Sequence, residues 1–465
     1  MNYTVDEIAG MLGAGVRGRA EARVSQVIAD SRLARAGSLF VALPGQHADG
    51  HEFVHDAFRR GATAALVRQD RHIEPAEHGT LIAVDDPLTA LYDLACGHSA
   101  VHRAAVRIAV TGSSGKTTTK EILGAILHRA SRSLVSEASF NAEVGLPMSV
   151  LRMTGQERFA VFEVGINSIG EMERYAALAR PDHALITNIG SAHVGRLGSR
   201  RDIAREKGAL LRSVPATGCV YLREQEPAAD LLLDGVCARV IRYGANSTIG
   251  YERSENLGLD GWSIHWEGLQ FRFSLPGRHN LDNALAALTV AAELGFDPQT
   301  VAAGIEAVRP APGRLTVHRG RCTVIDDGHN ANPESVRAAL AMLGEERSPA
   351  RRVVVLGPML ELGRYGARAH LDLAQPLIDA GIDILCCFGA ATRPLRDAFA
   401  DQIGRADAAD RAIWTETIEG IDGRLRAIVR DGDLVLLKAS RAFRIERLLP
   451  TLDVDTSDLT GRCDG

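Results

Sequence analysis

The stretch from 106 to 130, VRIAVTGSSGKTTTKEILGAILHRA, constrains the fold more than any other part of the chain. Apolar and β-branched residues predict a strand at VRIAV, and small residues predict a turn at TGSSG. The next segment predicts a helix, because its apolar residues at 122, 123, 126 and 127 fall on one side. A strand that passes through a glycine turn into a helix is typical of the phosphate-binding loop of open parallel sheets. The chain is therefore predicted to have α/β architecture.

The predicted turn carries residues that suit phosphate binding. Gly112 and Gly115 would let the backbone approach a phosphate closely, and the helix N-terminus adds a partial positive charge. Lys116 would pair with the terminal phosphates, and the Thr117 hydroxyl would ligate Mg²⁺. Val110 stands where the usual pattern has its first glycine, and the chain has no Asn-Lys-x-Asp guanine-reading motif, which favours ATP over GTP. The alternative is a capped helix with a flexible entry. The rest of the predicted nucleotide loop consists of Ser113, Ser114 and Thr118.

Composition narrows the classes of partner. The 465 residues are enough for about two to four domains, and 46% apolar with 24% charged residues is ordinary for a globular protein. A net charge of −5, with Lys and Arg scattered, gives no case for nucleic acid or an anionic membrane. The N-terminus does not resemble a secretory signal, and no apolar run reaches the roughly 18 residues of a membrane span. Seven dispersed cysteines without a CxxC pair predict reduced thiols and a cytoplasmic protein.

Strand-like and helical patterns alternate over most of the length, and we expect three domains at 1–102, 103–311 and 312–465. GWSIHWEGLQFRFSLPG alternates like a β-hairpin, and the proline-rich VRPAPGR at 308–314 predicts a linker that could act as a hinge. Beyond it, five strand-like runs predict an open, mostly parallel, doubly wound sheet. The helices expected between those strands fall at about 333–343, 366–379, 391–399 and 418–430.

Six motifs in series resemble the Mur ligases of peptidoglycan synthesis. They are DSRLARAGSLFVALPGQHADGHEFVHDAFRRGA, TGSSGKTTTKE, NIGSAHVGRLGS, LPGRHNLDNALAA, PGRLTV and DGHNANP. The resemblance covers nearly the whole chain. It implies a small α/β domain for a UDP-linked substrate, a central P-loop domain with a parallel sheet for ATP, and a Rossmann-like C-terminal domain. It also implies ATP-dependent, ADP-forming amide synthesis through an acyl phosphate, which adds D-alanyl-D-alanine to UDP-N-acetylmuramoyl-tripeptide. All of these partners are small molecules, and we expect a monomer.

The expected metal site depends on a strand end and on the resemblance. Glu163 ends the predicted strand AVFEV, so its carboxylate should face the crevice at the carboxyl edge of a parallel sheet. The resemblance implies that Glu163 and His193 bind Mg²⁺, with two ions in the full site, and that Lys207 is carbamylated. Carbon dioxide would turn the Lys207 ammonium, which repels Mg²⁺, into a carboxylate-like group. The alternatives are a solvated strand-end glutamate, a loop histidine and an ordinary exposed helix lysine.

Asn280 and Asn283 lie three apart on one predicted helix face, where they would suit the mixed edge of an adenine, or else cap the helix or support the hairpin. Arg314 follows the linker and could reach phosphates when the third domain closes. The expected catalytic residues are therefore Lys116, Glu163, His193, Lys207 and Arg314. Asp327 could accept from ribose hydroxyls.

Substrate recognition is expected to be divided between the two ends of the chain. Two cations and a hydroxyl past the last predicted strand, Lys438, Ser440 and Arg441, suit a carboxylate such as that of D-alanyl-D-alanine; the alternative is a basic surface cluster. The resemblance assigns the UDP-linked substrate to Ser31, Arg32, Asp49 and His51. It assigns further substrate contacts to Asn141, Asn330 and Asn332.

Several positions depart from the pattern of the family, and most of them lie in the third domain. Pro358 replaces an aspartate, Ala142 replaces a frequent asparagine, Gly328 and His329 replace a Ser-Tyr pair, and Ala439 falls within KASR, which replaces a Lys-Gly-Ser-Arg run. The identity of the amine therefore stays open, as does lysine or diaminopimelate in the acceptor. Two other hypotheses are a related ligase that joins a different acid and amine, and a P-loop regulator or kinase with no amide product.

Overall fold

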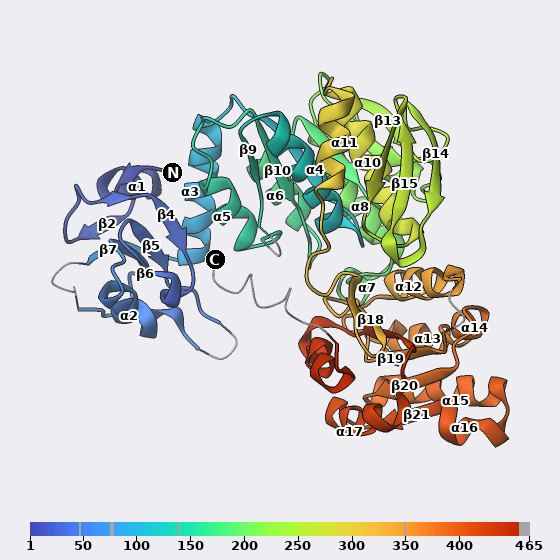
Figure 1. The fold of residues 1–465 in the computed structure, drawn as a ribbon. Coiled ribbons are helices and arrows are strands. Elements are labelled where there is room, and N and C mark those ends of the chain that lie inside the picture. The colour runs from blue at the N-terminus through green and yellow to red at the C-terminus, as the bar shows by residue number, and fades with distance from the viewer. Residues whose placement is uncertain (46–47, 75–78, 138–139, 348–349, 455–465) are drawn as a thin grey trace.

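The computed structural model describes residues 1–45, 48–74, 79–137, 140–347 and 350–454. These residues form three α/β domains, which follow one another along the chain as blue, green and orange lobes in Figure 1. The expected three-domain α/β fold is confirmed, while the boundaries at 102/103 and 311/312 stay predictions. Within the described ranges, no helix is long and apolar enough to cross a bilayer.

The N-terminal domain contains a five-stranded sheet in the order β2-β7-β6-β5-β4, in which β2 is antiparallel to its neighbour and the other pairs are parallel. The predicted strand SLFV is β5, and all four of its side chains are buried. Thr4 and Glu7 form a capping box at the start of α1, as Thr4 and the early acidic residues suggest. The elements are β1 (Tyr3–Thr4), α1 (Val5–Leu12), β2 (Gly15–Arg17), β3 (Arg23–Val24), β4 (Gln26–Ile28), β5 (Ser38–Val41), α2 (Val54–Arg59), β6 (Ala64–Arg68), β7 (Thr80–Val84) and α3 (Pro87–Val101).

The central domain contains a six-stranded, wholly parallel sheet in the order β13-β12-β11-β8-β10-β9. The strand of the opening motif, β8, lies between β11 and β10, and α4 begins at Lys116 directly after the glycine turn. Because parallel strands end at the same edge, the loops after β8, β10 and β11 lie side by side. The elements are β8 (Val106–Thr111), α4 (Lys116–Ala130), β9 (Ser133–Val135), α5 (Gly145–Leu151), β10 (Phe159–Glu163), α6 (Glu171–Ala179), β11 (His183–Ile186), α7 (Val194–Leu197), α8 (Arg200–Arg212), β12 (Cys219–Arg223), α9 (Ala229–Leu233) and β13 (Arg239–Tyr243).

The predicted hairpin is present as β15 (Trp262–Trp266) and β16 (Leu269–Phe273), and β14 (Tyr251–Asn256) adds a third antiparallel strand that the sequence reading missed. Trp262, Trp266 and Phe273 pack into one core with the apolar faces of α4 and α10 (Arg278–Glu293). This packing fixes α10 beside the phosphate loop. Helix α11 (Pro298–Glu306) then leads to the linker.

The C-terminal domain contains a six-stranded sheet in the order β17-β18-β22-β19-β20-β21, in which only β17 is antiparallel. The doubly wound prediction is confirmed. The helical pattern expected at about 366–379 is helical in the structure but is interrupted, forming α13 (Gly366–Leu371) and α14 (Ala374–Asp379). Pro376, in the first turn of α14, has no N–H to continue a preceding helix. The elements are β17 (Thr316–Arg319), β18 (Thr323–Asp326), α12 (Pro333–Glu345), β19 (Arg352–Leu356), α13 (Gly366–Leu371), α14 (Ala374–Asp379), β20 (Ile384–Phe388), α15 (Arg393–Ile403), α16 (Arg405–Arg411), β21 (Ala412–Thr415), α17 (Ile418–Ile428) and β22 (Leu434–Lys438).

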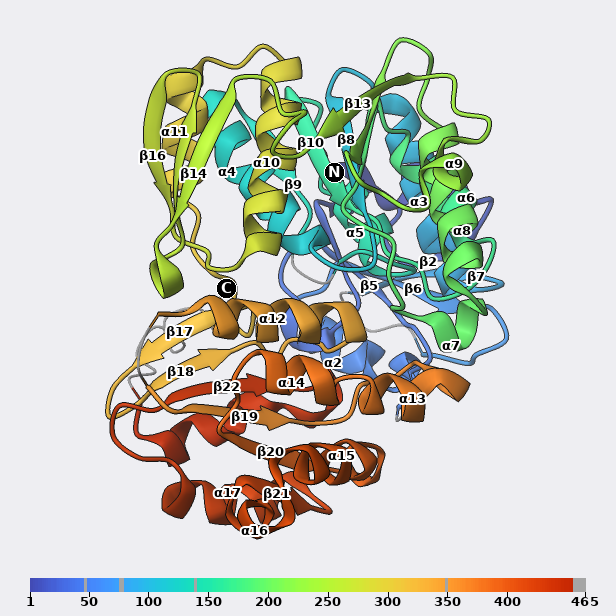
Figure 2. The ribbon, with the colours of Figure 1, turned by 90° about the vertical axis from the view of Figure 1, so that its right-hand side faces the viewer.

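The C-terminal domain lies against the central domain, with α12 facing the carboxyl edge of the central sheet (Figure 2). Several hydrogen bonds cross this boundary. The Ser191 hydroxyl donates to Glu334 Oε1 at 2.7 Å, and the backbone N–H of Leu259 donates to Glu346 Oε2 at 3.1 Å. The two domains are therefore closed onto each other in this structure.

Candidate nucleotide and ligase site

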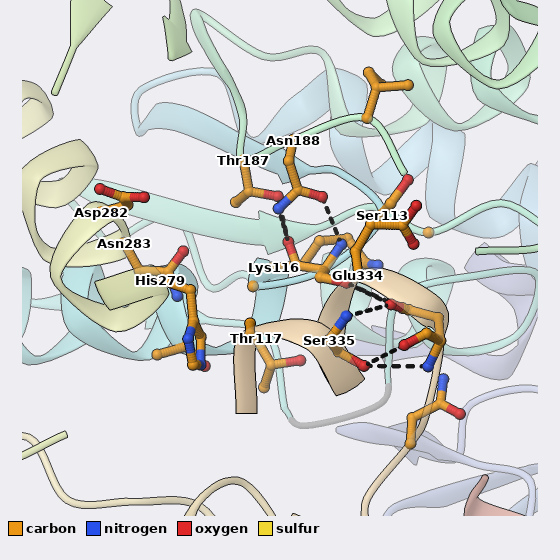
Figure 3. A pocket seen from close by; sticks show the side chains of 18 of the residues that line it. Ser113, Lys116, Thr117, Thr187, Asn188, His279, Asp282, Asn283, Glu334 and Ser335 are labelled. Atoms are coloured by element: carbon orange, nitrogen blue, oxygen red, sulfur yellow. Dashed lines mark hydrogen bonds between the residues drawn. The ribbon is translucent and has the colours of Figure 1, made fainter. Parts of the chain in front are cut away.

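A cavity of about 590 Å³ opens between the carboxyl edge of the central sheet and the C-terminal domain. Its walls come from the loops after β8, β10, β11 and β12, from α10, and from the C-terminal domain. In Figure 3, Glu334 and Ser335 of α12 lie near Ser113 and Lys116, while the α10 residues lie on the other side. The predicted site residues that line the cavity are Ser113, Ser114, Gly115, Lys116, Thr117, Thr118, Asn141, Glu163, His193, Asn280, Asn283, Arg314, Asp327, Asn330, Asn332 and Lys438.

The two glycines of the phosphate loop occupy positions that no side chain would fit. Gly112 has φ +147° and Gly115 has φ +81°, a region that residues with a Cβ rarely adopt. A Cβ at Gly112 would collide with the Thr187 hydroxyl, and one at Gly115 would lie 2.6 Å from Asn283 Oδ1. The loop therefore packs directly against the end of β11 and against α10, even though Val110 replaces the usual first glycine.

Asn188, in the loop after β11, holds the phosphate loop in shape. The Ser114 N–H donates to Asn188 Oδ1 at 3.1 Å, and Asn188 Nδ2 donates to the Ser114 carbonyl at 3.1 Å (Figure 3). The Lys116 ammonium donates to the Gly112 carbonyl at 2.9 Å, and burial lowers its pKa although Glu163 works to raise it. The loop is thus a preformed turn whose lysine is folded back over it, where a phosphate could replace the carbonyl.

Glu163 fits a cation ligand. The residue is 1% exposed, and Asn141 Nδ2 donates to Oε1 at 2.7 Å, while Oε2 is buried without a hydrogen-bond partner. Burial works to raise the pKa of Glu163, but Lys116 and the Asn141 donor outweigh it and hold the pKa below its usual value. The described residues contain no group of three or more His, Cys, Asp or Glu that could hold a metal by themselves. This donor set suits Mg²⁺, which takes one or two protein ligands and completes its shell with phosphate and water.

His193 lies directly before α7 with a left-handed backbone, φ 61°. Burial lowers the pKa of its imidazole to about 4, with Glu361 opposing, so the ring is neutral near pH 7 and able to ligate a cation. Its Nδ1 lies 2.7 Å from Glu361 Oε2 of the C-terminal domain, at ion-pair distance but out of line for a hydrogen bond.

Lys207 of α8 is buried, 2% exposed, so the alternative of an exposed helix lysine is wrong. Its ammonium donates to Thr111 Oγ1 at 3.3 Å, behind the phosphate loop, and it does not line the cavity. Burial and the nearby Lys116 lower the pKa of Lys207 well below the usual value. A buried amine with a lowered pKa is neutral more often, and the neutral amine is the form that reacts with carbon dioxide.

The C-terminal domain contributes a second wall to the cavity. Lys438 is buried at the end of β22, where its ammonium pairs with the Asp327 carboxylate and donates to the Asn330 carbonyl at 3.1 Å. Asp327 and Lys438 were predicted to bind a ribose and a carboxylate separately, but in this structure they satisfy each other. Asn332 Nδ2 donates to Ser114 Oγ at 3.0 Å, which joins α12 to the phosphate loop.

The predicted residues of the N-terminal domain lie outside this cavity. The Ser31 hydroxyl donates to Asp56 at 2.9 Å, and Arg32 pairs with Asp30. Asp49 accepts from the His51 backbone and lies 2.6 Å from His51 Nδ1, so these two side chains bond each other. At the other end, Ser440 accepts from the Leu360 N–H at 2.9 Å and Arg441 pairs with Glu446. Neither Ser440 nor Arg441 lines the cavity.

Sequence reasoning missed several polar residues of the cavity. Arg223 ends β12 and pairs with Asp282 of α10 at 2.6 Å, and Glu334 is the second residue of α12. The strand-end rule that identified Glu163 applies equally to Arg223. Glu334 and Glu361 gave no local signal, because their importance depends on two domains meeting.

The fold and the cavity define a P-loop protein in which a nucleotide-phosphate site is shared between a central and a C-terminal domain. Three family models match in chain order: "Mur ligase family, catalytic domain" at residues 23–106, "Mur ligase middle domain" at 110–291 and "Mur ligase, glutamate ligase domain" at 313–441. The chain belongs to the Mur ligase family.

The similarity to known proteins extends over nearly the whole of this chain. The chain is 34% identical to UDP-N-acetylmuramoyl-tripeptide–D-alanyl-D-alanine ligase of Treponema pallidum (91% of this chain, 92% of the relative) and 32% identical to the Bacillus subtilis protein of the same name (92% of each). Among solved structures, MurF from Acinetobacter baumannii superposes with a TM-score of 0.84 at 27% identity, covering 97% and 99%. MurF from Thermotoga maritima in complex with ADP gives 0.75 at 26% identity, covering 92% and 97%.

Proposed function

We propose that this chain joins D-alanyl-D-alanine to UDP-N-acetylmuramoyl-tripeptide in peptidoglycan precursor synthesis, with ATP converted to ADP and phosphate. The observation that carries the proposal is the shared cavity, where the phosphate loop meets α12 and Lys438 of the C-terminal domain. The names of the full-length relatives support the substrates, and the ADP-bound neighbour supports the nucleotide.

The residues of the cavity suit phosphoryl transfer from ATP to a substrate carboxylate. Lys116 and Arg314 would stabilise the negative charge on the transferred group, and the Gly112–Gly115 turn would hold the terminal phosphates. Glu163, with Thr117 and His193, would hold Mg²⁺, which neutralises phosphate charge when bound. The closed C-terminal domain would shield the acyl phosphate from water until the amine displaces the phosphate.

Four further roles belong to the same proposal. Asn280 and Asn283 border the turn and would contact the base, and the loops at Ser31 and Asp49 in the N-terminal domain would bind the UDP end. Lys438 would exchange its Asp327 partner for the carboxylate of the amine substrate. A carbamate on Lys207 would add negative charge behind the phosphate loop. We also propose a monomeric, cytoplasmic enzyme.

A second candidate is a ligase of the same chemistry with another amine. Of the departures in the third domain, only His329 lines the cavity. Gly328 is closely packed by Ile445, and Ala439 and Pro358 are buried and do not line the cavity. These three departures therefore change packing inside the C-terminal domain rather than the surface of the cavity. Burial lowers the pKa of His329 to about 4, so a neutral imidazole stands where the family has a tyrosine. Of these departures, His329 is therefore the one that could change which amine the cavity accepts.

The test is amine-dependent ADP release with mass detection of the product. UDP-muramoyl-tripeptide is supplied as acceptor, and D-alanyl-D-alanine is compared with single amino acids and other dipeptides, with Lys116→Met as the inactive control. We expect ADP release and a pentapeptide product only with D-alanyl-D-alanine. Product with a different amine would favour the second candidate, and ADP release without any amine would contradict both.

A further inference from the structure

Two short segments from different domains, one of which contains α7, meet in a tight contact beside the cavity, which we term the latch. It consists of residues 193–198 of the central domain and 361–365 of the C-terminal domain. The Gly195 N–H donates to the Glu361 carbonyl at 3.0 Å, and the Tyr365 hydroxyl donates to the Gly198 carbonyl at 3.2 Å. A Cβ at Gly195 would lie 2.5 Å from the Gly363 nitrogen. The two backbones are therefore in direct contact, with no room for a side chain between them.

The Glu361 carboxylate is the charged part of the latch. Its Oε2 lies 2.7 Å from His193 Nδ1, and its Oε1 lies 3.6 Å from Arg196. His193 and Glu361 both have left-handed backbones, at φ 61° and 63°, although neither is glycine. Such conformations are unfavourable for residues with a Cβ and persist where the surroundings impose them. Two strained residues that face each other across a domain boundary indicate that the surrounding structure imposes this contact.

We propose that Glu361 is a positioning residue that orients His193 for cation binding and does so only when the C-terminal domain is closed. Although Nδ1 is out of line for a hydrogen bond in this structure, the negative charge of a carboxylate 2.7 Å away favours the tautomer with the proton on that nitrogen. This tautomer leaves the Nε2 lone pair for a cation. Glu361 does not line the cavity, so in this proposal it acts through His193. The inference depends on the proposed role of His193 in the ligase site.

A thermodynamic consequence follows from the position of Glu361 on the other domain. If closure improves the cation site, then cation binding must favour closure by the same factor. Mg²⁺ and the C-terminal domain would then be coupled through this one side chain, and the nucleotide site would be complete only around a closed molecule.

The test uses the full chain and three variants. Glu361→Gln removes the charge and keeps the size of the side chain. Tyr365→Phe is the matched control, because it removes a latch hydrogen bond without touching His193. Arg196→Gln removes the cationic partner of Glu361. ADP affinity is measured by calorimetry over a Mg²⁺ series that includes EDTA, and compaction by small-angle X-ray scattering in the same solutions.

We expect the Mg²⁺ concentration that gives half-maximal tightening of ADP binding to rise about 10-fold in Glu361→Gln, the lower end of the loss seen when a carboxylate partner of a metal-bound histidine is removed. Mg²⁺ should then compact this variant less than the parent protein. In Tyr365→Phe and Arg196→Gln the Mg²⁺ midpoint should stay unchanged, even where compaction is reduced.

An unchanged Mg²⁺ midpoint in Glu361→Gln would overturn the inference, as would an equal shift in Tyr365→Phe, which would mean that any loosening of the latch has the same effect. These results differ from a failure of the proposed function. In that case the parent chain itself would bind ADP without any dependence on Mg²⁺, or would not bind it.

Discussion

Asn332 offers the sharpest test of the interdomain cavity, because its side chain both caps α12 and bonds to the phosphate loop. Its Oδ1 accepts from the Ser335 N–H at 2.8 Å and caps α12, and its Nδ2 donates to Ser114 Oγ at 3.0 Å in the phosphate loop. Asn332→Ala removes both contacts. Loss of the cap should cost about 1 kcal/mol of stability, and loss of the interdomain hydrogen bond about 1 kcal/mol of closure.

Asn332→Asp separates the two effects. Aspartate caps a helix as well as asparagine does, so calorimetry should show an unfolding midpoint close to that of the parent chain. The Ala variant should unfold about 3 °C lower, the shift expected for 1 kcal/mol in a domain of this size. Asn332→Ala should lose about five-fold in kcat/KM, because it loses the interdomain hydrogen bond. Asn332→Asp can still accept from the Ser114 hydroxyl, but it should lose more than five-fold because it brings a negative charge toward the phosphates.

The assay is amine-dependent ADP release, with nucleotide affinity measured in parallel. The reasoning would be refuted if Asn332→Ala kept full nucleotide affinity and kcat/KM while losing stability, since Asn332 would then be a cap alone. Equal loss of stability in the Ala and Asp variants would contradict the assignment of the cap.

Three further predictions concern the loop, the fold and the buried lysine. Gly115→Ala should abolish nucleotide binding, because the added Cβ would lie 2.6 Å from Asn283 Oδ1 and φ is +81°. The control Gly170→Ala, at φ +89° with open space around it, should only lower stability. Equal nucleotide affinities in the two variants would contradict the loop geometry. Burial lowers the pKa of His98 to about 4 from its ordinary 6.5, so between these values the unfolded chain binds one proton more than the folded chain. The free energy of unfolding, measured by chemical denaturation, should therefore fall by about 2 kcal/mol from about pH 7 to pH 5. It should fall less steeply in His98→Gln. Lys207→Met should lose ligase activity, and intact-mass analysis of the gently handled parent chain should show the added mass of one CO₂; an unmodified lysine, with activity independent of bicarbonate, would rule out the carbamate.

The sequence was informative wherever function depends on neighbours in the chain. The strand, glycine turn and helix around Lys116 form a local unit, so their fold and their place at the edge of a parallel sheet followed from pattern alone. Glu163 was placed in the cavity by the same rule, since a strand end in a parallel sheet faces the crevice.

Long-range pairing was not accessible in this way. Asp327 and Lys438 are 111 positions apart, and only the sheet pairing of β18 with β22 brings them together, so the sequence could suggest two binding groups but not that they satisfy each other. The same limit applies to Glu361, whose contact with His193 exists only because two domains close. The strained backbone of both residues is a structural signal without a sequence counterpart.

The most direct measurement is a crystal structure of the full chain with Mg²⁺ and a non-hydrolysable ATP mimic. Lys116, now bonded to the Gly112 carbonyl at 2.9 Å, should turn to the terminal phosphates, and the unpartnered Glu163 oxygen should contact the cation. A mimic bound elsewhere, with Lys116 still on Gly112 and Glu163 without a cation, would contradict the assignment of this cavity as the site of carboxyl activation.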